Sequence, residues 1–104
     1  MSINKIKNKD ICIDIDGVLT NETKGHNYSQ RTVKNGIQEI LEGLKDRNNR
    51  IILYTARRQC DKEVTINWLQ ENKLIFNEIY FDKPLADIYI DDKMMDFKIW
   101  KKYY

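Results

Sequence analysis

Several features that mark special classes of protein are missing from this 104-residue sequence. It has only two cysteines, Cys12 and Cys60, too few for a disulfide framework, so we expect a reducing, cytoplasmic setting. No apolar run approaches the ~20 residues that span a membrane, and the N-terminus lacks the apolar segment of a signal peptide. The net charge of +2 is too small to suggest binding to nucleic acid or to membranes.

The overall composition is that of a small globular domain. Apolar residues make up 41% of the chain and charged residues 33%. We find no repeats, linkers or low-complexity segments, so residues 1–104 are interpreted as a single domain with one core.

A short apolar run that ends in two carboxylates is the centre of the pattern. Residues 10–15 are rich in β-branched side chains and predict a buried strand, in which Cys12 would be an inert buried thiol. Asp14 and Asp16 end this strand two positions apart, a spacing that points both side chains the same way. Gly17 then permits a turn. Two carboxylates held together need compensation, which a divalent cation would supply.

Strands and helices alternate through the rest of the chain. Apolar residues at helical spacing, from Val33 to Leu44, predict a helix that ends near Asn49. Further expected elements are a strand Arg50–Tyr54, a helix from a capping Asp61 to about Asn72, strands Phe76–Phe81 and Ala86–Ile90, and a helix Met94–Lys101. This order predicts an α/β fold: a small Rossmann-like three-layer sandwich with a mostly parallel sheet of about four strands.

Polar residues follow the expected strands where such sheets bind ligands, at the carboxyl ends. They are Asp14 and Asp16, then Thr55 and Arg57, then Lys83, and finally Asp91 and Asp92. Alone, each has an ordinary structural explanation as a turn or a helix cap. Their joint occurrence at strand ends favours a common site.

These residues resemble, in order and spacing, the four signature motifs of the haloacid dehalogenase-like superfamily of phosphatases. The first motif is the stretch from Asp14 to Thr20, the second is Thr55, the third is Lys83 and the fourth is the pair Asp91–Asp92. The strings around Thr55, Trp68, Lys83 and Asp91 are also similar to uncapped bacterial phosphatases of capsule and surface-polysaccharide synthesis. That similarity implies a phosphorylated sugar, or a sugar derivative, as substrate.

The resemblance implies a role for the carboxylates and a metal. Asp14 would be the nucleophile that forms an aspartyl phosphate, and Asp16 would transfer protons. Mg²⁺ would be held by Asp14, by the backbone carbonyl of Asp16 and by Asp91 or Asp92.

The other motif residues would contact the phosphate group. Thr55, with Gly17, would bind phosphate oxygens, and Lys83 would balance the negative charge and assist catalysis. Arg57, or its neighbour Arg58, could reach the substrate's anionic part, although a solvated surface position is the alternative for both.

The spacing of the motifs leaves no room for a cap domain. About 15 residues separate Gly17 from Val33, and about 27 separate Thr55 from Lys83. The site is therefore expected to be open, or covered by a neighbouring subunit of a homo-oligomer. His26, Asn27 and Tyr28 belong to the first of these gaps and lie either in a solvated loop or near the mouth of the site.

Three alternatives to a sugar phosphatase stay open. A nucleotidase shares the Thr-Ala-Arg and Ile-Asp-Asp strings but carries a helical cap. A phosphoacceptor receiver domain would have its acidic pair first, whereas here Asp91 and Asp92 come last. A non-catalytic phosphate-binding module would not need every catalytic position filled.

Overall fold

Three parallel strands form one sheet in the computed structural model, which describes residues 3–95. They are β1 (Asp10–Ile13), β2 (Arg50–Tyr54) and β3 (Glu78–Tyr80), in the order β1-β2-β3. Ile13 is paired with Leu53, and Leu53 with Ile79. The predicted parallel α/β fold is therefore confirmed, and β2 has the predicted bounds.

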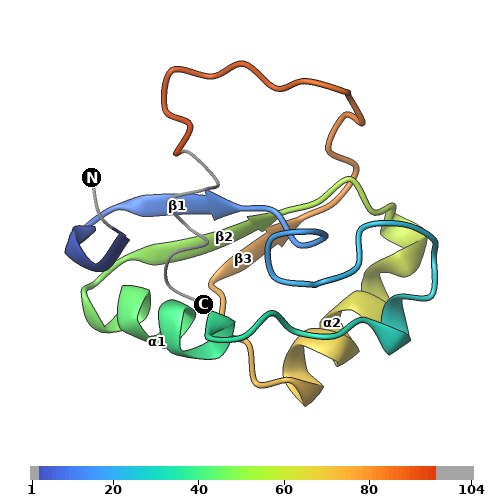
Figure 1. Ribbon diagram of the computed structural model, residues 1–104, viewed down its shortest axis with the longest axis horizontal. Coiled ribbons are helices and arrows are strands. Elements are labelled where there is room, and N and C mark those ends of the chain that lie inside the picture. Colours follow the sequence, from blue (N-terminus) through green and yellow to red (C-terminus); the bar gives the residue numbers. More distant parts are fainter. Residues whose placement is uncertain (1–2, 96–104) are drawn as a thin grey trace.

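Both long helices cover the same face of this sheet (Figure 1). Helix α1 (Ile37–Asp46) connects β1 to β2, and α2 (Lys62–Glu71) connects β2 to β3. The two crossovers run in the same direction across the sheet, and right-handed crossovers of that kind place their helices on one side. Residues 3–95 thus form two layers, where the sequence predicted three. The regular structure also includes three short 3-10 helices: η1 (Ile3–Lys5), η2 (Tyr28–Gln30) and η3 (Gln59–Asp61).

The core lies between the sheet and the two helices. Alternate residues of β1 and β2, including Ile13, Ile51 and Leu53, are buried there, as the period of a strand requires. The apolar positions predicted from helical spacing meet them: Ile37, Leu41 and Leu44 from α1, and Trp68 and Leu69 from α2.

The ends of the helices depend on different contacts from those predicted. The side-chain amide of Asn49 donates to the carbonyl of Leu44 and to that of Ile6, so it closes the end of α1 and fastens the N-terminal segment. Asp61 precedes α2 as predicted, but its side chain makes no capping hydrogen bond. In residues 3–95 no helix is long and apolar enough to cross a membrane.

The opposite face of the sheet carries side chains that the described chain leaves uncovered. By the strand register Cys12 lies beside Ile52 on this face, and Tyr54 beside Tyr80. Cys12 is exposed, which corrects the prediction of a buried thiol, because alternation along β1 turns it away from the helices.

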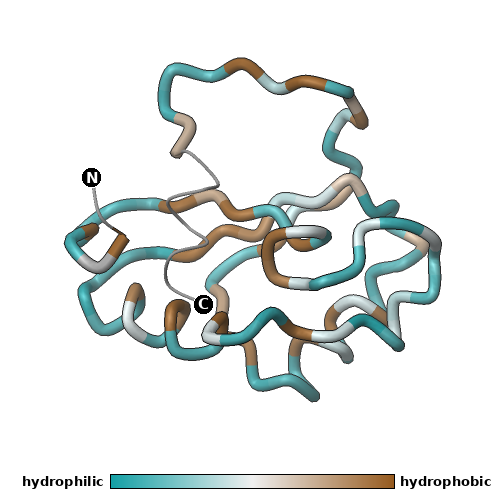
Figure 2. The backbone as a smooth tube through the Cα atoms, viewed as in Figure 1, coloured by the Kyte–Doolittle hydropathy of each residue, from teal (hydrophilic) through white to brown (hydrophobic). Residues whose placement is uncertain are grey.

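The segment after β3 departs from the prediction. Residues 86–90 form no strand and arch away from the sheet instead (Figure 1). Their apolar side chains are exposed, Ile90 at 96% and Ile88 at 74%. The backbone of this arch includes stretches coloured as hydrophobic in Figure 2. The alternating pattern suits a strand, but a strand also needs a partner, and among residues 3–95 this segment is paired with none. The predicted helix Met94–Lys101 lies largely outside the described residues.

Candidate active site

Asp14 lies directly after β1, at the carboxyl edge of the sheet. Its Oδ1 atom accepts a hydrogen bond of 2.8 Å from the backbone N–H of Ile15, and its Oδ2 atom lies 3.9 Å from Nζ of Lys83. Partial burial raises the pKa of this carboxyl above its usual range, and the nearby Lys83 ammonium offsets part of that increase. With 38% of its side chain exposed, Asp14 remains accessible to a small molecule.

Lys83 reaches Asp14 from a loop that the end of β2 holds in place. Its backbone N–H donates to the carbonyl of Thr55 over 3.0 Å. The ammonium group lies 4.3 Å from the ring centre of Tyr89 and 5.5 Å from that of Tyr54. These aromatic faces hold the cation close to the carboxylate. Residues 69 positions apart in sequence therefore meet at the strand end, as the motif order predicts.

Asp16 has different partners. Arg57 binds both of its oxygens, with Nε 3.0 Å from Oδ2 and Nη2 2.7 Å from Oδ1. Nε of Arg31 lies 3.5 Å from Oδ1. Only 22% of the Asp16 side chain is exposed. This carboxylate is thus fixed by two arginines, in a bidentate geometry that is strong and directional.

Thr55 and Gly17 make internal contacts at the positions predicted to bind phosphate. Thr55 is fully buried, and its hydroxyl accepts a hydrogen bond from the backbone N–H of Arg57. Gly17 has φ of +83°, and its N–H donates to the hydroxyl of Thr20. An added Cβ at Gly17 would lie 3.0 Å from Cγ2 of Thr23, so the turn needs glycine.

The structure contradicts the predicted exposure of Arg57 to substrate. The side chain is 1% exposed, and its remaining terminal nitrogen, Nη1, donates to the hydroxyl of Thr65. Arg31, which sequence reasoning missed, is also buried, with 5% of its side chain exposed. No local pattern identifies Arg31, because a single arginine in a polar loop usually faces solvent.

The acidic side chains of the predicted metal site form no cluster of three or more within residues 3–95. Asp91 and Asp92 are both exposed, and the Asp91 side chain accepts a hydrogen bond from the backbone N–H of Lys93. Within residues 3–95 no group of three or more acidic, histidine or cysteine side chains could hold a metal ion. The carboxylate of Asp14 has Lys83 as its charge partner instead.

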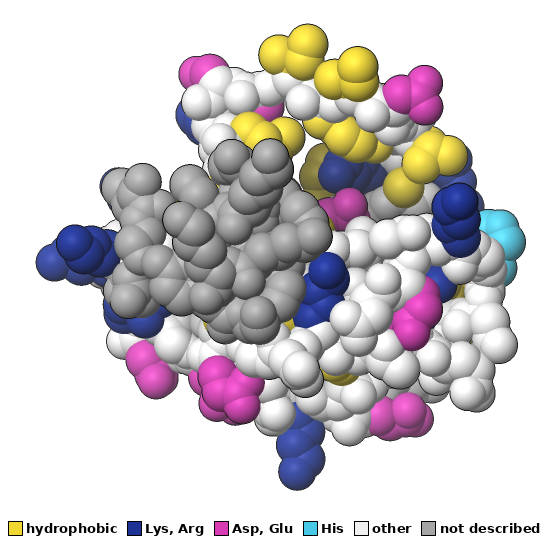
Figure 3. Space-filling model, in the orientation of Figure 1, with side chains coloured by type: hydrophobic (Ala, Val, Ile, Leu, Met, Phe, Trp, Pro, Cys, Tyr) yellow, Lys and Arg dark blue, Asp and Glu magenta, His cyan; other side chains and the backbone are white. Residues whose placement is uncertain are grey.

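Among the described residues the site is a partly exposed edge of the sheet, with 38% of the Asp14 side chain exposed. Figure 3 shows a hollow between the segment after β3 and the body of the protein, where basic and acidic side chains lie among apolar ones.

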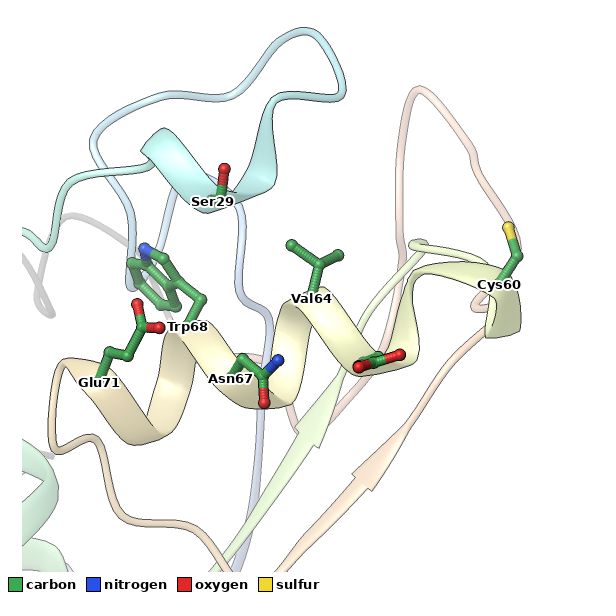
Figure 4. A pocket seen from close by; sticks show the side chains of 7 residues that line it. Ser29, Cys60, Val64, Asn67, Trp68 and Glu71 are labelled. Carbon is green, nitrogen blue, oxygen red and sulfur yellow. The ribbon is translucent and has the colours of Figure 1, made fainter.

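Two shallow grooves, of about 410 and 460 Å³, lie elsewhere, along α2. Val64 points from α2 toward η2, which carries Ser29, across the first groove (Figure 4). None of the predicted site residues lines either groove. The reactive side chains therefore place the candidate site at the strand edge and not in these grooves.

A comparison with family models identifies the family of this chain. The family model of the LNS2 domain of PITM 1-3 matches residues 11–102. The chain belongs to the LNS2 domain family. LNS2 domains have a haloacid dehalogenase-like fold and are related to phosphatases, in agreement with the superfamily resemblance. A search of curated proteins found no significant match.

Solved structures share the fold of this LNS2 domain. A crystal structure of an MCSG target from Vibrio cholerae has a TM-score of 0.73 at 21% identity, over 90% of this chain and 98% of that chain. A Pnkp1/Rnl/Hen1 complex has a TM-score of 0.62 at 21% identity, over 94% of this chain. The LNS2 domain spans only 34% of that second chain.

Proposed function

We propose that this LNS2 domain is a phosphomonoester hydrolase with Asp14 as its nucleophile. The observation that carries the proposal is the approach of Lys83 Nζ to 3.9 Å from Asp14 Oδ2, at the carboxyl end of β1. A carboxylate that is partly exposed and faces a fixed ammonium can meet a phosphate dianion without unbalanced repulsion. The relation of the family to phosphatases supports the same reaction.

The reaction has two balanced steps. In the first, an oxygen of Asp14 attacks phosphorus, the P–O bond to the leaving group breaks, and Asp16, which has taken up a proton from solvent beforehand, gives that proton to the departing oxygen. In the second, water attacks the phosphorus of the aspartyl phosphate, its proton passes to Asp16, and the bond to Asp14 breaks. The products are an alcohol and inorganic phosphate.

Magnesium is proposed as the cofactor on the resemblance alone. Bound Mg²⁺ would neutralise phosphate oxygens. The described residues do not fit it as they stand, since Asp91 and Asp92 do not join Asp14 and Asp16 in a cluster of acidic side chains. The steps above therefore use only the side chains of the protein.

We propose that the substrate is a phosphorylated sugar or a sugar derivative. We propose further that the protein acts in the cytoplasm of a bacterium, in the synthesis of surface polysaccharide. The open strand edge agrees with the absence of a cap insertion, and a homo-oligomer could cover it. A nucleotide substrate is the second candidate, and phosphate binding without turnover is the third. These three make different predictions for the same assay.

The test is hydrolysis of an aryl phosphate by the wild type and by Asp14→Asn, with Mg²⁺ and with a chelator. We expect loss of the nucleophile to reduce kcat at least about 10³-fold. Asp10→Asn is the matched control, because Asp10 is an exposed carboxylate on the same strand, and its rate should equal that of the wild type. Equal rates for the wild type and Asp14→Asn would overturn the proposal.

A substrate panel then separates the candidates. Sugar phosphates, nucleotides and simple alkyl phosphates would be compared by kcat/KM under the same conditions. Preference for sugar phosphates supports the proposal, preference for nucleotides supports the nucleotidase, and binding of phosphate without any turnover supports the non-catalytic module.

A further inference from the structure

Arg57 is the most completely engaged charged side chain of the candidate site. Its Nε and Nη2 atoms bind the two oxygens of Asp16, and Nη1 donates to the hydroxyl of Thr65 over 3.0 Å. The centre of the guanidinium lies 3.9 Å from the ring centre of Tyr28. Because the side chain is only 1% exposed, a phosphate in solution has little access to it.

The contacts of Arg57 come from separate parts of the chain. Asp16 follows β1, Tyr28 belongs to η2, and Thr65 lies in α2. The end of η2 is itself fastened to α2, since the indole N–H of Trp68 donates over 2.9 Å to the carbonyl of Arg31, the residue that follows η2. Because contacts from three sides fix the orientation of the Arg57 guanidinium, they also fix the orientation of the Asp16 carboxylate that it binds.

We propose that Arg57 is a positioning residue, whose function is to aim the carboxyl group of Asp16 during proton transfer. The inference rests on the proposed phosphatase reaction and assigns Arg57 a role different from the substrate binding expected from its position in the sequence. Arg31 supports the same carboxylate from a second direction, with its Nε 3.5 Å from Oδ1 of Asp16.

A positioning role has a kinetic signature that substrate binding lacks. Proton donation matters most when the departing oxygen is a poor leaving group, as in an alkyl phosphate, and little when it is a good one, as in p-nitrophenyl phosphate. Misplacing Asp16 should therefore slow alkyl phosphates selectively and leave KM unchanged. Loss of a direct phosphate contact would instead raise KM for both substrates.

The experiment compares Arg57→Lys with Arg50→Lys on one alkyl phosphate and on p-nitrophenyl phosphate. Lysine keeps the charge but cannot bind both oxygens of Asp16. We expect kcat of Arg57→Lys to fall about 100-fold for the alkyl phosphate and less than about tenfold for the aryl phosphate, with KM within about twofold of the wild type. Arg50 is the matched control, because it begins β2, at the end of the strand opposite to the site, and 46% of its side chain is exposed, so both rates should remain unchanged.

A milder variant keeps the test decisive if Arg57→Lys folds poorly. Thr65→Val removes the acceptor of Nη1 but retains the shape of the side chain and the ion pair with Asp16. We expect a selective loss of about tenfold with the alkyl phosphate. Equal losses with both substrates, or a raised KM without the selective loss, would overturn the role of Arg57. A wild type no faster than Asp14→Asn would instead overturn the phosphatase proposal itself.

Discussion

Asp14 and Asp16 are two residues apart, yet they lie in opposite surroundings. Asp16 is held by two buried arginines, Arg57 and Arg31, which contact its carboxylate oxygens. Asp14 lies at the strand edge, with the Lys83 ammonium 3.9 Å away and 38% of its side chain exposed. The difference teaches that two nearby carboxylates of one motif can differ in kind: one is held rigidly by its neighbours, and the other stays accessible for reaction.

The largest expected change in stability comes from breaking the buried ion pair of Arg57 with Asp16. Arg57→Met removes the bidentate partner of Asp16 and leaves a carboxylate poorly compensated, so we expect the free energy of unfolding to fall by about 3 kcal/mol. Urea denaturation followed by circular dichroism measures this change. Arg58→Met, at the exposed neighbouring position, should alter stability by less than about 0.5 kcal/mol. Similar effects from the two variants would show that Arg57 is not buried in solution.

An intermediate effect is expected from the aromatic support of the same cluster. Tyr28→Leu removes the ring that lies 3.9 Å from the Arg57 guanidinium, and we expect a loss of about 1 kcal/mol from the cation–π contact. His26→Ala is the control, since His26 is exposed and its ring contacts the Tyr28 hydroxyl and ring but not the Arg57 guanidinium among the described interactions. A loss for His26→Ala as large as that for Tyr28→Leu would contradict this account.

The smallest expected change in stability is at Asp14, where the substitution should stabilise the protein instead of destabilising it. Because burial raises the pKa of Asp14 in the folded state, ionisation of this carboxyl lowers stability at pH values above the ordinary carboxyl range. In chelator, Asp14→Asn should therefore be slightly more stable than the wild type at pH 7, by less than about 1 kcal/mol. The advantage should vanish below the ordinary carboxyl pKa, where both states of the wild type are protonated. A lower melting temperature for Asp14→Asn at pH 7 would refute the prediction.

Local pattern was sufficient for most of the fold. The bounds of β2 and the buried face of α1 follow from side-chain period, which depends only on neighbours in the chain. The expected strand at residues 86–90 did not form, because an alternating pattern does not specify which edge a strand will pair with.

The same limit applies to the candidate site. The approach of Lys83 to Asp14 could be predicted from the motif order. The burial of Arg57 could not, because an arginine at a strand end can bind an external anion or an internal carboxylate. Only the fold shows that Asp16, 41 positions earlier, reaches it first.

The order of the strands has a consequence for how the protein is made. Because β1, β2 and β3 are neighbours in the sheet in the order in which they are synthesised, each can pair with one already complete as the chain emerges from the ribosome. Lys83 follows β3, so it is added after all three strands. Asp16 can thus acquire Arg57 while translation continues, whereas Asp14 receives its cation only when the sheet is finished.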